Sequence, residues 1–250
     1  MKIKSILILI LVLLLAASCS QGTPDPGGEP IPLKEAKLII EHNATAEDTG
    51  FQGFVDSEGW KSLTVTGPEG KVLTLTGQGK LGNLGLTELF FETVEPPNAD
   101  VPISEVLKML PEGNYTIEGP AIEAGEGKGR TIGTAVLTHT IPAGPDLLTP
   151  EEDATVPADK DLLVSWSPVT ETIDGSPVNI IAYQLIIEKD EDPHPHMIGK
   201  FGLSMYLPPS VTSIPIPKAF LEPGTPYLWE VLAIEESGNQ TLSSGAFRTQ

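Results

Sequence analysis

The chain is poor in cysteine and in basic residues. It has one cysteine in 250 residues, so no disulfide forms within it and core packing alone must hold its folded part together. Lysine and arginine number 15 against 34 aspartates and glutamates, a formal net charge of −19. Because phosphate recognition needs clusters of Lys and Arg, this shortage argues against a nucleic-acid partner.

Motifs of the common catalytic sites are also missing. The sequence has no G-x-S-x-G elbow and no H-E-x-x-H, and the glycines at 77–80 lack the spacing and the hydroxyl residue of a P-loop. His194 and His196 lie beside acidic residues, but a metal site needs further ligands, and an exposed acidic loop is the simpler interpretation. We therefore expect no enzyme activity.

Only one long apolar run is present, over residues 6–17. It is shorter than the roughly 20 residues that span a bilayer. Lys2 and Lys4 precede it, and small residues lead from it to Cys19. A basic start, a short apolar core and a small-residue cleavage point are typical of a secretory signal peptide.

The position of Cys19 makes this segment resemble the lipobox of bacterial lipoproteins. The resemblance implies a signal peptide over 1–18, acylation of Cys19 (palmitate among its chains) and a lipid anchor in the cell envelope. Ser20 favours sorting to the outer membrane. Ala16 is a weaker lipobox residue than leucine, so an ordinary signal peptide with an incidental cysteine is the alternative.

The remainder of the chain is strongly acidic and divides at two stretches rich in proline and glycine. Since Lys2 and Lys4 are two of the 15 basic residues, removal of 1–18 leaves 13 basic and 34 acidic residues, a formal charge of −21. This charge favours solubility. Residues 19–34 are expected to form a flexible tether. The second stretch, 141–145, predicts a boundary between domains over 35–142 and 143–250.

Turn residues at short intervals predict an all-β chain of two tandem β-sandwich domains. Glycine (25) and proline (24) separate short alternating runs, and no long helical period is visible. In the first domain the residues 67–70 mark a hairpin turn, and apolar residues at helical spacing predict one short helix over 103–110. Its expected strands are 36–41, 60–66, 71–76, 84–94, 115–118 and 131–141.

The second domain resembles a fibronectin type III (Ig-like) domain over roughly 145–250. The matching residues are Trp166 in its second strand, Tyr183 in its third and the segment Leu221–Tyr227 before its sixth. The resemblance implies that the leucine and tyrosine of this segment form a corner that pins a loop to the sandwich. Prolines at alternate positions in 213–217 predict an edge strand, because proline cannot donate a ladder hydrogen bond.

Residues 41–58 are dense in oxygen ligands. Calcium takes six to eight oxygens from carboxylates, amides and carbonyls. The expected ligands of a weak calcium site are Asn43, Asp48, Asp56 and Glu58. The alternative is a polar turn whose side chains bond their own backbone. We expect no other cofactor.

Strand alternation in the second domain predicts an apolar outer patch, formed by Ile186, Leu228, Leu232 and Ile234. Contiguous exposed apolar surface marks a contact site. The alternatives are packing against the first domain and cover from the loop 189–210.

Together these patterns predict a non-catalytic envelope lipoprotein that acts as a protein-binding or structural module. One alternative is a carbohydrate-binding module, in which exposed Phe51, Phe54 and Trp60 would stack on a glycan; these rings are otherwise core residues. Another is an accessory subunit of an envelope enzyme or secretion system.

Overall fold

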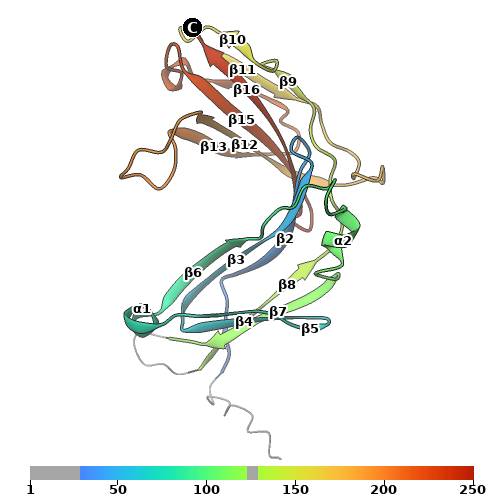
Figure 1. Ribbon diagram of the computed structural model, residues 1–250, viewed down its shortest axis with the longest axis vertical. Helices are drawn as coiled ribbons and strands as arrows, with labels where there is room; N and C mark the ends of the chain where they lie inside the picture. The colour runs from blue at the N-terminus through green and yellow to red at the C-terminus, as the bar shows by residue number, and fades with distance from the viewer. Residues whose placement is uncertain (1–28, 123–128) are drawn as a thin grey trace, which may run out of the picture.

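The computed structural model describes residues 29–122 and 129–250, and these are almost entirely β, as expected (Figure 1). The predicted signal peptide, Cys19 and most of the expected tether lie outside the described residues. No helix within the described ranges is long and apolar enough to cross a membrane.

The N-terminal half forms a sandwich of two sheets around one hydrophobic core. One layer has the strand order β1-β8-β7-β4-β5, and the other contains β2, β3 and β6. The buried side chains of the core include Ile40, Trp60 and Tyr115. The elements are β1 (Ile31–Pro32), β2 (Glu35–Asn43), β3 (Asp48–Trp60), β4 (Ser62–Gly67), β5 (Gly70–Thr76), α1 (Gly79–Leu84), β6 (Leu86–Glu92), α2 (Ile103–Leu107), β7 (Gly113–Pro120) and β8 (Arg130–Leu137).

The structure corrects two expectations for this half. Residues 31–34 were expected in the tether, but β1 pairs with β8. The apolar side chain of Leu33 then packs against the core of this half. Residues 48–58, expected in a calcium site or a polar turn, belong instead to the long strand β3, in which buried positions mostly alternate with half-buried ones. The expected hairpin at 67–70 is confirmed, since Gly67 pairs with Gly70.

The C-terminal half has the expected fibronectin type III arrangement. The sheet β14-β11-β9 packs on β13-β12-β15-β16 over a core that contains Trp166, Tyr183 and Trp229. β14 is an edge strand, as its prolines predicted. The elements are β9 (Leu147–Thr149), β10 (Ala154–Val156), β11 (Leu162–Trp166), β12 (Ile180–Lys189), β13 (Gly202–Leu207), β14 (Ser213–Ile216), η1 (Lys218–Phe220), β15 (Pro226–Glu235) and β16 (Gln240–Thr249).

The corner implied by the resemblance is present. The Tyr227 hydroxyl accepts a hydrogen bond from the Glu222 N–H (2.9 Å) and donates one to the Phe220 carbonyl (3.3 Å). Leu221 is buried beside it. These bonds hold the loop before β15 against the sandwich.

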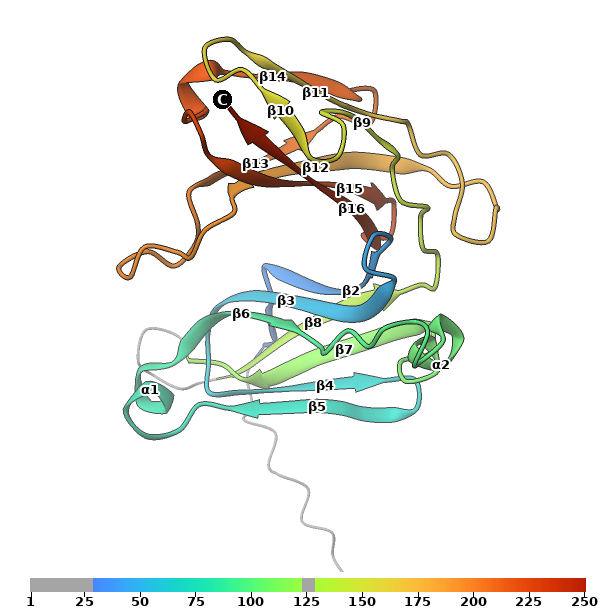
Figure 2. The same cartoon turned by 45° about the horizontal axis from the view of Figure 1, so that its top comes forward.

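The two halves share one sheet. β16 pairs in parallel with β2, with Gln240 opposite Glu41 and Leu242 opposite Asn43. The shared sheet therefore runs β13-β12-β15-β16-β2-β3-β6 through both halves (Figures 1 and 2). The sequence offers no sign of this pairing.

The two halves meet at a joint, the pairing of β16 with β2, and a buried asparagine links them there. Asn239, in the turn between β15 and β16, accepts a hydrogen bond from the Ile40 N–H (2.8 Å). Its side-chain NH₂ donates to Thr138 (carbonyl and hydroxyl, each 3.0 Å) and to the Thr140 carbonyl (2.9 Å). All of these partners lie N-terminal to residue 142, so one side chain from the second half satisfies the backbone of the first. The Glu235 carboxylate stabilises this β15–β16 turn by accepting a hydrogen bond from the Asn239 N–H (3.1 Å).

We expect Asn239→Ala to lower the free energy of unfolding by about 1–3 kcal/mol, because the Ile40 N–H is left buried without a partner. Urea denaturation followed by tryptophan fluorescence measures the loss. Asn179→Ala is the matched control, because the Asn179 amide is exposed and makes its side-chain bond to Glu236 at the surface (3.1 Å). Equal stability of the two variants would contradict the role of Asn239.

Candidate functional site

The shared sheet curves, and its end strands β13 and β6 lie on the same side of the molecule (Figure 1). The register places Ile234, Gln240, Glu41 and Gly50 side by side in one row across β15, β16, β2 and β3. This row crosses the joint. The outer face of the sheet is therefore continuous from one half to the other.

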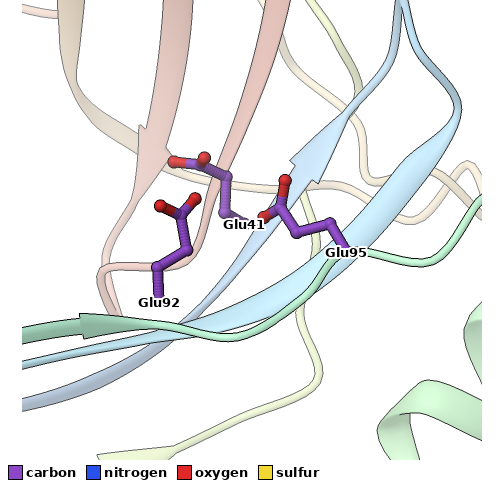
Figure 3. A group of neighbouring side chains, drawn as sticks. All are labelled: Glu41, Glu92 and Glu95. Carbon is purple, nitrogen blue, oxygen red and sulfur yellow. The ribbon is translucent and has the colours of Figure 1, made fainter.

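Three glutamates meet on the first-domain side of this face. Glu41 extends from β2, Glu92 ends β6, and Glu95 follows it (Figure 3). One carboxylate oxygen of each lies within 4.8 Å of the others. Glu41 is 7% exposed, whereas Glu95 is half-buried and Glu92 exposed. Within the described ranges no lysine or arginine forms an ion pair with any of them.

Local structure explains how the three carboxylates come so close. The segment after β6 stays against β3 because the Thr93 hydroxyl accepts from the Phe51 N–H and the Thr93 N–H donates to the Phe51 carbonyl, both at 2.9 Å. Gly50 leaves room for Glu95, since a Cβ there would lie 2.7 Å from the Glu95 Cγ. The amides of Gln240 and Gln52 then bond Glu41 and Glu92 respectively.

Burial and mutual repulsion raise the pKa values of two of these three carboxyl groups. Burial, followed by the charges of Glu41, Glu92 and Asp48, raises the pKa of Glu95 to about 7. Burial likewise raises the pKa of Glu41, against the lowering effect of its hydrogen bond from Gln240. The Glu95 Oε1 is buried without a hydrogen-bond partner. Counted as one oxygen from each carboxylate, the cluster offers three of the six to eight ligands that calcium takes, so it does not by itself complete a calcium coordination shell.

The structure does not bring the four expected calcium ligands together. Asn43 and Asp48 pair at one end of the β2–β3 hairpin. The Asn43 side chain accepts from the N–H groups of residues 45 and 46 (3.0 and 2.9 Å), which is the alternative polar turn. Asp56 lies eight residues further along the extended β3, roughly 26 Å away at about 3.3 Å per residue, and Glu58 pairs with Lys34 (3.0 Å). Because the strand separates them, these residues cannot surround one ion, and the expected ligand set is corrected.

The other ligand candidates also separate in space. Phe51 and Trp60 are core residues and Phe54 is half-buried, so the three rings do not form an exposed platform for a sugar. The rings of His194 and His196 are 5.5 Å apart in an exposed loop. In the part of the chain that the structure describes, no third ligand residue joins them.

The expected apolar patch is only partly exposed. The register puts Ile186, Leu228, Leu232 and Ile234 on the outer face, as predicted. However, Leu232 is buried, Ile186 and Ile234 are half-buried, and only Leu228 is exposed. Of the four predicted residues, Leu228 alone is therefore freely exposed.

An apolar groove lies at the joint instead. It encloses about 540 Å³ and is lined by side chains from both halves. Tyr206 of β13 is 71% exposed, Val136 of β8 57% and Ile181 of β12 48%. Ile39 and Ile234 add to its apolar lining, and Gln240 lies on its wall. Sequence analysis missed the groove because Val136 and Tyr206 belong to different halves.

The fold and this face define a two-domain β protein with an exposed interdomain surface. No family model matches the chain, and no curated protein matches it. Among solved structures, it is similar to the FN1–FN3 domains of chicken CNTN1, at 14% identity over 88% of this chain, with a TM-score of 0.33. The chain covers 65% of that structure's length. It is also similar to a segment of two fibronectin type III domains from chicken tenascin, at 15% identity over 87% of this chain and 99% of the segment, with a TM-score of 0.30.

We expect Glu95→Gln to flatten the dependence of stability on pH. A carboxyl whose pKa rises from 4.5 to about 7 on folding binds more protons folded than unfolded between these values, so its contribution to stability is lost as the pH rises through that window. The variant should melt at a higher temperature than the wild type at pH 8 and lose less between pH 5 and 8. Exposed Glu151→Gln is the control, and parallel wild-type and Glu95→Gln profiles would contradict the expectation.

Proposed function

We propose that the chain is a lipid-anchored, non-catalytic protein of the bacterial cell envelope that binds a protein partner or serves as a structural module. The observation that carries the binding role is the interdomain groove, where three large apolar side chains remain exposed in an otherwise strongly acidic protein. The joint supports the same role, because a hydrogen-bonded connection holds the contributions of both halves in one surface.

The anchor is proposed from the order of residues around Cys19. A basic start, a short apolar run and a cysteine after small residues support lipidation and, with Ser20, attachment to the outer membrane. An acidic protein is repelled by an anionic lipid surface, so acyl chains would provide the membrane affinity that its own surface lacks.

A non-catalytic role fits the placement of the histidines. His42 is buried and its Nδ1 lies 2.9 Å from both the Asp48 carbonyl and the Thr49 hydroxyl. His139 Nε2 lies 2.9 Å from the Leu110 carbonyl. Both rings are therefore engaged in bonds that hold the fold. The carbohydrate-binding alternative has lost the support of its three aromatic candidates, and an accessory subunit is one form of the proposed role.

Lipidation predicts that cells fed a fatty-acid analogue will label the wild-type protein and not Cys19→Ala. Ala16→Leu, which strengthens the lipobox, should retain or increase the label. Fractionation should then place the wild-type protein with the outer membrane and release Cys19→Ala. Equal labelling of wild type and Cys19→Ala would refute the anchor.

A protein-binding role predicts discrete cross-linked adducts in the native envelope. Photoreactive residues are placed at exposed positions in both halves, at Leu84, Met109, Glu151 and Tyr206. At least one position should yield a protein adduct of defined mass, while the others serve as internal controls. Adduct formation at none of them, together with glycan-array binding, would replace the proposal with the carbohydrate alternative.

A further inference from the structure

We propose that the interdomain groove and the neighbouring glutamate cluster form one docking face for an extended, basic segment of a partner protein that carries apolar side chains at intervals. The inference rests on the proposed protein-binding function and adds the chemistry of the partner. It joins the groove, which both halves line, to the glutamate cluster, which lies in the first half.

The apolar half of the face is the groove. Tyr206, Val136 and Ile181 are each about half exposed or more, and Ile39 and Ile234 lie beside them. Exposed apolar side chains that gather in one concave place, with polar residues around them, are typical of a site that another molecule covers. The apolar side chains of a bound segment would fill this groove.

The acidic half of the face adjoins it directly. Gln240 lines the groove and also donates a hydrogen bond to Glu41. Glu230, on the outer face of β15, lies close enough to Glu41 to raise its pKa. Two lysines lie near this face. Lys200 lowers the pKa of Glu230, and Lys37 at the groove is already paired with Glu35 (3.3 Å). The face therefore presents an excess of carboxylates, and charge complementarity calls for a cationic segment.

The spacing of the two halves suits an extended chain. Ile234, Gln240 and Glu41 lie in one row across three adjacent strands, so the first and last are separated by two strand spacings, about 10 Å. An extended peptide advances about 3.3 Å per residue. Because side chains of an extended chain alternate between its two faces, an apolar and a basic side chain two or four residues apart lie on one face and span about 7 or 13 Å, which brackets this separation.

Other ligand classes use only part of this face. A metal ion would find three carboxylates and leave the groove empty. An anionic polymer or lipid surface would be repelled by the charge of −19. A basic segment with apolar side chains uses both halves, and the observations favour it for that reason.

The test is fluorescence anisotropy with a labelled synthetic peptide of repeated Lys-Leu-Ser and the full protein. We expect Glu92→Gln with Glu95→Gln to weaken binding roughly ten-fold, because the cationic side chains lose their partners. At pH 8, above the pKa of about 7 of Glu95, the matched control Glu151→Gln with Asp159→Asn removes the same charge from exposed positions around β10 and should change binding less than about two-fold.

The apolar half is tested with the same peptide and a second one of repeated Lys-Ser-Ser. Tyr206→Ser with Val136→Ser should weaken binding of the leucine peptide and leave that of the serine peptide unchanged. Leu84→Ser with Met109→Ser, two exposed apolar residues of the first half, is the control. Melting temperatures confirm that each variant is folded, and Tyr206→Ser alone serves if the double variant is not.

Two results would overturn the inference. Equal weakening by both carboxylate pairs would mean that only overall charge matters, and equal affinity for the two peptides would mean that the groove is not used. A cross-linked protein adduct at Leu84, Met109 or Glu151, without one at Tyr206, would also overturn it. That last result would leave the proposed protein-binding function standing, so the two failures are distinguishable.

Discussion

The parallel pairing of β16 with β2 is the interaction on which the rest of this structure depends. It makes one sheet out of two and brings Asn239 to the backbone of the first domain. Buried amides need partners, so the Asn239 side chain and the Ile40 N–H constrain the two cores to one geometry. The groove exists only in that geometry because both halves line it, whereas the glutamate cluster lies within the first half and contacts the joint through Gln240.

Local patterns were enough to predict much of the fold. In the second domain, the family resemblance carried by Trp166, Tyr183 and the segment Leu221–Tyr227 implied the corner, and the Tyr227 hydrogen bonds confirm it. In the first domain the turn at 67–70 predicted the β4–β5 hairpin. β3 was missed because polar side chains on its half-buried face resemble those of a loop.

The candidate site was beyond what sequence could predict. Gln240 and Glu41 are 199 positions apart, and no local signal specifies a parallel pairing between such distant strands. The expected calcium site failed for a related reason. Residues a few positions apart lie close together in a turn, but along an extended strand such as β3 each further residue adds about 3.3 Å to their distance. Asp56 was therefore carried away from Asp48, while Glu92 and Glu95 were brought to Glu41 from a different part of the chain.

The position of the joint also has a consequence for how the protein acquires its shape. Contacts between residues so far apart in sequence form late, because a long loop must close before they are made. We therefore expect each domain to build its own core first and the Asn239 turn to dock onto β2 last. Until then the Ile40 N–H and the edge of β2 are open to water and to other strands. An open strand edge of this kind is where pairing with the wrong strand can occur.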